Sequence, residues 1–192
     1  MSQNLQILDT LISQLSNTHI NMDIDSKSTD PKTRTLTKYY PAALDEKEAS
    51  SLYSLLKDNL QWEDGIYSNK AKKMSRKAYS MGGATDQVGQ MIEEEIEKVI
   101  KKCSLKTGGK EIIFGTYINY YRNGFDFLPS HSHKGMVQMV ISLGATRKLT
   151  VGKKVYNIKN GDVIVFGSSS HGIPIEPEVT EGRISIATFM KP

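Results

Sequence analysis

"INYYRNGFDFLPSHSH", residues 118–133, carries the pattern on which the fold and the candidate site depend. Its first part is rich in β-branched and aromatic residues and predicts a strand, and Asn123-Gly124 predicts a turn. His131 and His133 stand one residue apart in the extended part that follows. Because residues i and i+2 of a strand point to the same face, these two imidazoles can meet at one ion.

The segments around this stretch continue the strand pattern to the end of the chain. Short runs of β-branched and aromatic residues are separated by Gly, Asn and Lys turns. These runs are IIFGTYINYY, MVQMVISLG, RKLTVG, KVYNI, DVIVFG and RISIATFM. Helical periodicity is confined to the residues before them. This order, helices first and strands afterwards, predicts an α+β fold in which about residues 111–190 form an antiparallel barrel or sandwich.

The N-terminal half predicts three amphipathic helices. Residues 3–17 form the first, and a polar linker follows it. Residues 46–60 form the second, where Asp45 and Glu48 are spaced as in a capping box. The chain therefore divides into an extension with a linker, residues 1–36, and one domain, residues 37–192.

The third helix begins at Thr85 or Asp86, either of which can cap it. Its predicted core stripe recurs at helical spacing and consists of Val88, Met91, Ile92, Ile96, Val99, Ile100 and Cys103. Ahead of this helix, Asp64-Gly65 predicts a turn.

Amino-acid composition limits the kinds of binding partner and the cellular compartment that we expect. The net charge is +4, which permits an anionic partner without requiring one. A single cysteine cannot form an internal disulfide, so a reducing compartment is expected. The sequence has no apolar run long enough for a membrane span and no secretory signal at its start. We therefore expect an intracellular protein, cytoplasmic or nuclear, with no membrane partner.

A third histidine, His171, lies in "GSSSHGIP" after several further predicted strands. Those strands are enough to wrap a small barrel and return His171 to the pair at His131 and His133. Three imidazoles on one side of a metal ion leave positions open for substrate or oxygen. The alternative is that one or more of these histidines is an ordinary surface or core residue. Because only neutral imidazole binds metal, we expect binding to weaken as the pH falls through ~6.5.

"KAKKMSRK", residues 70–77, is strongly basic and lies in front of the predicted barrel. Basic side chains next to tyrosines are suited to a phosphate backbone and a stacked base. The candidate substrate contacts are Lys72, Lys73, Arg76 and Tyr79. The alternative is a solvated loop without a partner.

Taken in order, these motifs resemble the AlkB-like family of dioxygenases that use Fe(II) and 2-oxoglutarate. Asn119 and Tyr121 match the family's N-x-Y, and His131 falls at its first metal histidine. "VISLGA" resembles the family's S-L-G strand, and "NGDVIVFGSSSHGI" resembles the segment that carries the last metal histidine, here His171. "GRISIATF" resembles the closing strand, whose first arginine is Arg183. "MSRKAYSMGG" is faintly similar to the nucleotide lid.

The resemblance implies a double-stranded β-helix, or jelly roll, with the N-terminal helices packed outside. It implies Fe(II) and 2-oxoglutarate as cofactors, with Asn119, Tyr121 and Arg183 as cosubstrate contacts. It implies oxidative dealkylation of a nucleobase in DNA or RNA, the chemistry of nucleic acid demethylation and DNA repair. An arginine fits a buried dicarboxylate, because its charge is permanent and its donors are forked.

Two positions depart from the family pattern. His133 stands where the family has its metal aspartate, so the site would have three nitrogen ligands and a higher net charge. Phe189 stands where the family has a second arginine, which braces the cosubstrate and the metal carboxylate. Losing both suggests one coordinated change, and altered chemistry, a non-catalytic protein and a different acid as cosubstrate are its alternative meanings. Lys191 is a candidate to replace part of the arginine's role.

Three hypotheses follow for the function. The first is an AlkB-like oxygenase that acts on nucleic acid. The second is a catalytically silent AlkB-like module that binds nucleic acid through its basic segment. The third is a cupin-like metal protein with an unrelated substrate. Fold alone does not choose among them.

Overall fold

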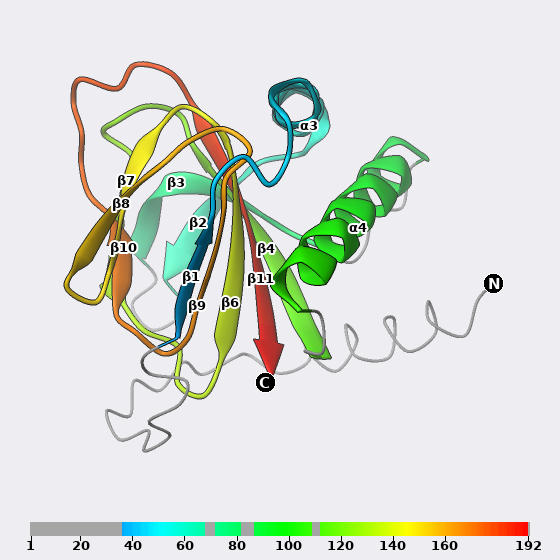
Figure 1. Ribbon diagram of the computed structural model, residues 1–192. Helices are drawn as coiled ribbons and strands as arrows, with labels where there is room; N and C mark the ends of the chain where they lie inside the picture. Colours follow the sequence, from blue (N-terminus) through cyan, green and yellow to red (C-terminus); the bar gives the residue numbers. More distant parts are fainter. Residues whose placement is uncertain (1–35, 68–71, 82–86, 109–111, 192) are drawn as a thin grey trace.

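The computed structural model describes residues 36–67, 72–81, 87–108 and 112–191 (Figure 1). The predicted first helix, its linker and the predicted cap residues Thr85 and Asp86 lie outside the described residues. Along the chain the elements are β1 (Thr37–Tyr40), α3 (Glu46–Asn59), β2 (Glu63–Tyr67), β3 (Lys72–Ser80), α4 (Gln87–Thr107), β4 (Ile112–Tyr121), β5 (Leu128–His131), β6 (Val137–Gly144), β7 (Arg147–Val151), β8 (Lys154–Ile158), β9 (Val163–Phe166), β10 (His171–Ile173) and β11 (Arg183–Lys191).

The strands form two sheets that face each other. The larger sheet has the order β1-β9-β6-β11-β4-β3-β2, and the smaller has the order β5-β10-β7-β8. Neighbouring strands pair antiparallel in both sheets, for example β11 with β4 and with β6. The α+β class and the jelly-roll arrangement of the strands are therefore confirmed.

Because side chains alternate between the two faces of the large sheet, the sheet has one hydrophobic core layer on each face. On its outer face, Met139, Ile141 and Ile184 join a cluster with residues of both helices. On its inner face, Val140 and Ala187 pack against residues of the small sheet. The residues of β6 and β11 that share this inner face include polar ones, and these create the lining of the candidate site.

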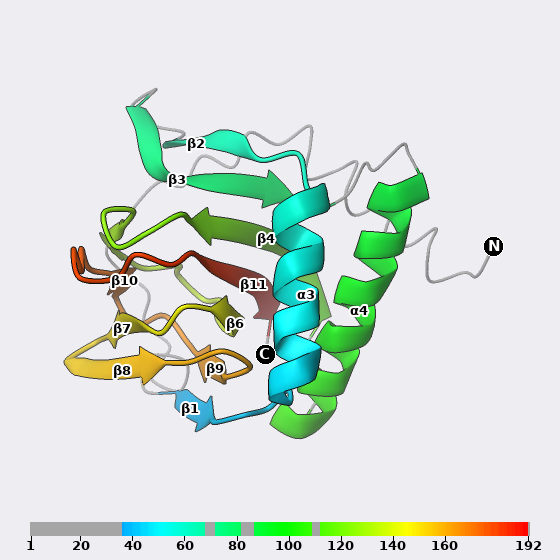
Figure 2. The ribbon, with the colours of Figure 1, turned by 90° about the horizontal axis from the view of Figure 1, so that it is seen from above.

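Both helices lie against the outer face of the large sheet (Figure 2). As predicted, Asp45 caps α3, and its carboxylate accepts a hydrogen bond from the Glu48 N–H at 2.8 Å. The helix buries Leu52 and Leu56. Among the residues that the structure describes, no helix is long and apolar enough to cross a membrane.

The predicted core stripe of α4 is correct except at its first turns. Ile92, Ile96, Val99, Ile100 and Cys103 are buried. Val88 and Met91 are instead 48% and 63% exposed, because the buried part of the helix begins only at Ile92.

Three strands of the large sheet were not predicted from the sequence: β1 at one end, and β2 with its neighbour β3 at the other. The residues at Asp64-Gly65, where we expected a turn, lie inside β2, and the register shifts between Asp64 and Ile66. A β-bulge of this kind has the same preference for glycine as a turn. The basic segment, expected as a loop, is largely β3, which pairs with β2 and β4.

The turn at Asn123-Gly124 requires its glycine. The Gly124 N–H donates to the Val179 carbonyl at 2.7 Å, and its own carbonyl accepts from the Glu176 N–H at 2.9 Å. A β-carbon on Gly124 would lie 1.7 Å from the Glu176 carbonyl oxygen. This close contact joins the loop before β5 to the loop before β11.

Candidate metal centre

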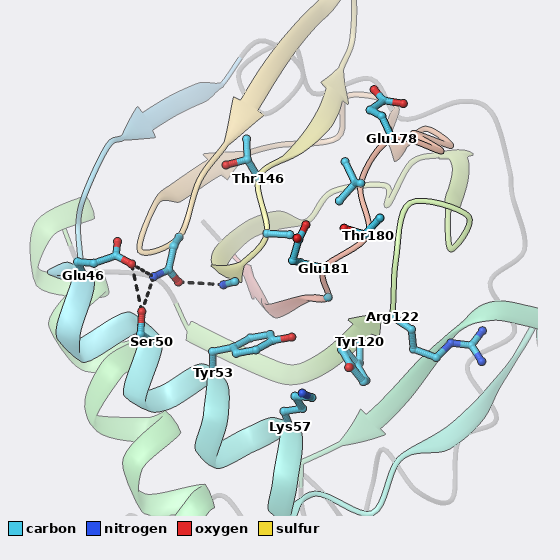
Figure 3. Close-up of a pocket in the computed structure, with 15 residues that line it drawn as sticks. Glu46, Ser50, Tyr53, Lys57, Tyr120, Arg122, Thr146, Glu178, Thr180 and Glu181 are labelled. Atoms are coloured by element: carbon cyan, nitrogen blue, oxygen red, sulfur yellow. Dashed lines mark hydrogen bonds between the residues drawn. The ribbon is translucent and has the colours of Figure 1, made fainter.

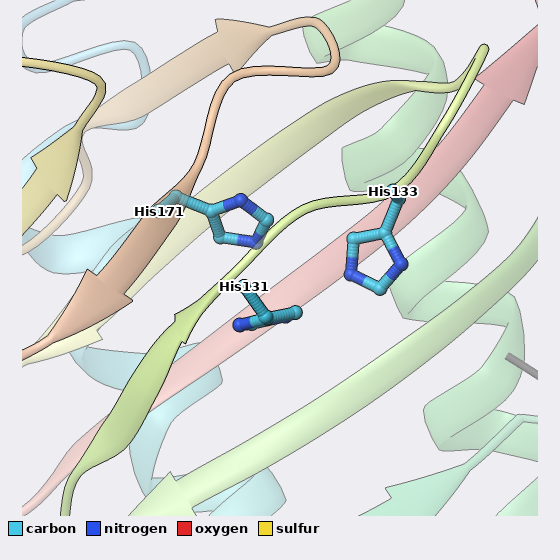
Figure 4. A group of neighbouring side chains, drawn as sticks. All are labelled: His131, His133 and His171. Carbon is cyan, nitrogen blue, oxygen red and sulfur yellow. The ribbon is translucent and has the colours of Figure 1, made fainter. Parts of the chain in front are cut away.

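The strand pairing of the small sheet brings the three histidines together. His131, at the end of β5, is the direct partner of His171, at the start of β10. His133 follows β5 by two residues, and its ring turns toward the other two (Figure 4). One candidate ligand atom from each residue lies within 4.8 Å of those of the other two. This spacing suits three ligands of a single ion.

Backbone hydrogen bonds orient two of the rings. The Nδ1 atom of His131 lies 2.9 Å from the Pro129 carbonyl, and the Nδ1 atom of His171 lies 3.1 Å from the Ser169 carbonyl. Because a carbonyl only accepts, each Nδ1 must carry the proton. The Nε2 atom of each ring then keeps a free lone pair, as in a metal-binding histidine held by an outer-shell partner.

Burial keeps these imidazoles neutral. It lowers the pKa of His171 to about 3 and that of His133 to about 4, and in both cases the nearby His131 adds to the effect. The pKa of His131 is also lowered, chiefly by burial. Neutral imidazole is the form that binds metal, so the triad is ready for an ion at physiological pH.

Two phenylalanine rings pack against histidines of the triad. The Phe166 ring centroid lies 4.7 Å from that of His171, and the Phe189 centroid lies 4.8 Å from that of His133. The two departures from the AlkB-like pattern are thus in direct contact. An apolar ring packs against a neutral imidazole where the family would place an arginine beside a carboxylate.

Arg183 lies at the start of β11 and is 1% exposed. Its Nε donates to the Ser142 hydroxyl at 2.9 Å, and its guanidinium carbon lies 5.4 Å from the centre of the Tyr121 ring. Its Nη2 has no hydrogen-bond partner among the described residues. Burial lowers the pKa of Arg183 to about 10, which leaves the side chain charged at neutral pH. A buried cation with a free N–H calls for an anionic ligand.

The predicted cosubstrate contacts do not all meet. Arg183 and Tyr121 are adjacent, because the two residues are direct partners in the pairing of β11 with β4. Asn119 lies one inward-facing position further along β4. Its carbonyl oxygen accepts a hydrogen bond from Arg76 Nε at 2.9 Å, and its amide nitrogen lies 3.5 Å from the Ser185 hydroxyl.

The predicted nucleic-acid contacts are divided between the two faces of β3. Arg76, a predicted substrate contact, is buried on the inner face at 8% exposure. Tyr79 packs against the outer cluster with the helices, and its hydroxyl lies 3.4 Å from Glu93. It therefore faces away from the triad and is not placed to stack a base there. Lys72 and Lys73 belong to β3, where they are the strand partners of Tyr67 and Ile66 in β2.

Several buried polar residues were missed by sequence reasoning. Gln138, Ser142 and Ser185 line the inner face of β6 and β11, and the signal for them was a polar residue at alternate positions of an otherwise apolar strand. Arg147 and Glu176 form a buried ion pair at 3.0 Å. Arg147 also donates to the carbonyls of Asn123, Asp126 and Pro174, so it fixes the loops around the site.

A separate open groove of about 910 Å³ lies beside α3, and none of its lining residues belongs to the triad (Figure 3). Asn160 donates to Glu46 and to Ser50, both at 3.0 Å, and its carbonyl oxygen accepts from the Gly144 N–H. Side chains of both charges line the groove, which indicates an ordinary polar surface.

Comparison with known proteins agrees with this geometry. No protein-family model matches the chain, and no curated protein does. A 2OG-Fe(II) oxygenase family oxidoreductase from Burkholderia pseudomallei is 17% identical, with a TM-score of 0.59 over 81% of this chain and 84% of that one. A Pseudomonas putida prolyl-4-hydroxylase is 12% identical, with a TM-score of 0.56 over 81% and 92%.

A Trichoplax adhaerens prolyl hydroxylase, solved with a hypoxia-inducible factor peptide, is 12% identical with a TM-score of 0.57, and the match covers 100% of this chain and 93% of that one. At such identities the likeness shows the fold. The chain therefore has the jelly-roll fold of the 2OG-Fe(II) oxygenases. Its particular resemblance to the AlkB-like members stays a prediction.

Proposed function

We propose that this protein is an oxygenase that uses Fe(II) and 2-oxoglutarate. The observation that carries the proposal is the pairing of three neutral, convergent imidazoles with a buried, unpaired arginine inside one jelly roll. The imidazoles suit a divalent ion, and the arginine suits the distal carboxylate of a dicarboxylic acid. The Burkholderia pseudomallei protein with the same fold is an oxidoreductase of the 2OG-Fe(II) oxygenase family.

His131, His133 and His171 would hold the iron, which when bound supplies oxygen activation coupled to decarboxylation of the 2-oxo acid. Around it, this chain's own residues bind, orient and exclude water. Arg183 fixes the distal carboxylate, and Tyr121 supports the guanidinium with its ring. Phe166 and Phe189 pack against His171 and His133 and limit the access of water on that side, which strengthens charge interactions at the site.

The three-histidine set has a clear electrostatic consequence. With a carboxylate ligand, the ion and its ligands would carry a net charge of about +1, whereas three neutral imidazoles leave it at about +2. A three-histidine site therefore attracts an anionic cosubstrate more strongly than a site with a carboxylate ligand does. The Phe189 ring adds no further positive charge next to His133.

Two substrate classes are candidates for the hydroxylation. Dealkylation of a nucleobase is the finer prediction from the sequence, and Lys72 and Lys73 are its remaining support, because Arg76 and Tyr79 point elsewhere. Hydroxylation of a peptidyl proline is the second, and it is favoured by the prolyl hydroxylases with the same fold. Incubation with a methylated oligonucleotide and with a proline-rich peptide, followed by mass spectrometry, distinguishes a loss of CH₂ from a gain of oxygen.

The cofactor proposal is tested by anaerobic titration of the metal-free protein with Fe(II) and 2-oxoglutarate. We expect a visible charge-transfer band with one equivalent of iron, and succinate release when air is admitted. In the His171→Ala variant the band should be lost and metal affinity should fall by more than the ~10–100-fold that removal of an outer-shell partner costs. His19→Ala, which changes the fourth histidine of the chain, is the matched control.

The outcomes separate the three hypotheses for function. Binding of both cofactors without succinate release would favour a catalytically silent module. Metal binding without affinity for 2-oxoglutarate would favour a cupin-like protein. Unchanged metal affinity in His171→Ala would overturn the metal centre itself.

A further inference from the structure

Arg76 is a second buried guanidinium on the inner face of the large sheet, and it comes from β3. It is 8% exposed. Ala78, two residues on, pairs with Asn119, so Arg76 shares the inner face of the sheet with both. Its Nε is held by Asn119, but its Nη1 has no hydrogen-bond partner among the described residues.

A continuous row of polar groups joins Arg76 to Arg183. Asn119 accepts from Arg76 and lies 3.5 Å from the Ser185 hydroxyl. Ser185 is the direct strand partner of Ser142, whose hydroxyl accepts from Arg183. The row crosses four neighbouring strands and has a guanidinium with an unused N–H at each end. This row of polar groups is therefore suited to bind a ligand with two anionic groups, one at each guanidinium.

Arg76 comes from a strand that approaches the metal ligands. Strand β3 contacts β5, which ends at His131, and the Ser75 hydroxyl donates to the Phe127 carbonyl at 2.9 Å, just before β5. No salt bridge joins either Arg76 or Arg183 to an acidic side chain within the described ranges. Two buried cations and a divalent ion would therefore face one another until an anion arrives.

We propose that Arg76 binds the carboxylate of the 2-oxo acid that lies beside the metal, while Arg183 binds the distal carboxylate. This inference rests on the proposed function. Because Phe189 stands where the AlkB-like pattern has a second arginine, the carboxylate beside the metal needs another partner, and Arg76 supplies it. Asn119 is then a positioning residue, because it orients Arg76 and does not need to contact the acid. In this protein the second arginine comes from β3, the neighbour of the edge strand β2, instead of from β11.

The test compares two acids by calorimetry on protein loaded with Ni(II), without turnover. 2-Oxoglutarate carries both carboxylates, whereas 2-oxobutanoate carries only the one beside the keto group. Arg76→Gln should weaken both acids by about 10- to 100-fold, the usual value of a charge-assisted hydrogen bond. Arg183→Gln should weaken 2-oxoglutarate to a similar degree and leave 2-oxobutanoate unchanged.

Two further variants control for folding. Lys77→Gln alters the neighbouring residue on the opposite face of β3, where the lysine pairs with Asp64, and should change neither affinity. Arg76→Lys keeps the charge without the fork and should give an intermediate loss. It also serves as the test if Arg76→Gln does not fold.

Each outcome is decisive. Unchanged affinities in Arg76→Gln and Arg76→Lys would overturn the inference and leave the proposed function standing. A loss confined to 2-oxoglutarate would place Arg76 at the distal carboxylate and overturn it too. A parent protein that binds neither acid would overturn the proposed function, and the inference with it.

Discussion

Each imidazole of the triad is held in the form that a metal requires. Hydrogen bonds from Nδ1 to backbone carbonyls select the tautomer of His131 and His171. Burial disfavours the protonated form of all three rings. The site therefore needs little rearrangement when an ion enters.

This burial predicts an unusual pH dependence of metal affinity. Protons compete with the ion only below the pKa of the ligands in the folded protein, and that pKa is about 4 for His133 and about 3 for His171. The weakening that the sequence alone placed at ~6.5 for free imidazole should therefore be shifted to lower pH. We expect nearly constant Zn(II) affinity between pH 7.5 and 6, measured against a competing chelator. A steep fall centred at pH 6.5 would contradict this.

Contacts between elements explain why two distant positions change together. His133 follows β5, and Phe189 lies in β11, yet their rings are in contact. An aspartate at position 133 alone would place a carboxylate against a phenyl ring, without an arginine to brace it beside the metal ion. An arginine at position 189 alone would add a cation beside the divalent ion.

A double-mutant cycle should therefore be strongly non-additive. We expect His133→Asp and Phe189→Arg each to lower Fe(II) affinity or 2-oxoglutarate turnover, and the combined variant to exceed both single variants. The coupling energy should be about 0.5–3 kcal/mol, the range for residues in contact. In the combined variant, turnover should also exceed that of the parent. If neither His133→Asp nor the combined variant differs from the parent in metal binding or turnover, His133 is not a metal ligand.

The basic strand β3 offers a separate test of a nucleic-acid partner. If Lys72 and Lys73 contact phosphates, each substitution by Gln should reduce the slope of log affinity against log salt by about 0.7–0.9. Arg76→Gln should leave that slope unchanged, because the side chain is buried. Fluorescence anisotropy with a single-stranded oligonucleotide at several salt concentrations measures both. A slope that the lysine substitutions leave unaltered would remove this support for nucleic acid.

The strands and helices differ in how much of them could be predicted. Six of the strands from residue 112 onward were identified because apolar and β-branched residues dominate them, and α3 because Asp45 and Glu48 mark its start. The short strands β5 and β10, which carry His131 and His171, were not among the predicted strands. Strand β3 was missed because its lysines give it the composition of a solvated segment. Its burial of Arg76 depends on pairing with β4, which no local pattern encodes.

The same distinction holds for the site. The histidines and Arg183 could be singled out, because metal ligands and a strand-end arginine form recognisable motifs. The ion pair of Arg147 with Glu176 could not, because its partners are far apart in the sequence and meet only through loop packing. Arg147 also donates hydrogen bonds to three backbone carbonyls, so its role in fixing the loops is visible only in the folded molecule.

At the scale of the whole molecule, two layers of core divide structural and chemical roles. The outer layer joins the helices to the large sheet through an apolar cluster, and the buried Thr116 and Thr188 hydroxyls beside it bond to each other. The inner layer is apolar where the sheets meet, but polar and charged toward the triad. Buried cations and neutral imidazoles cost folding energy, which the outer layer must offset. The metal and the acid should therefore stabilise the fold by binding only to the native state.

This division predicts how the stability of the metal-free protein depends on pH. Because the pKa of His171 is about 3 in the folded chain and ~6.5 in the unfolded one, the unfolded chain binds an extra proton below pH 6.5. Stability is then full above pH 6.5 and falls as the pH is lowered, by about 2 kcal/mol from this residue between pH 6.5 and 5. Urea unfolding at pH 7.5 and at pH 5 should show this loss in the parent. A His171→Leu variant, which has no imidazole to protonate, should lose about 2 kcal/mol less over the same range. Equal losses in the two proteins would mean that His171 is not held neutral by burial, and the case for a preformed metal centre would fail with it.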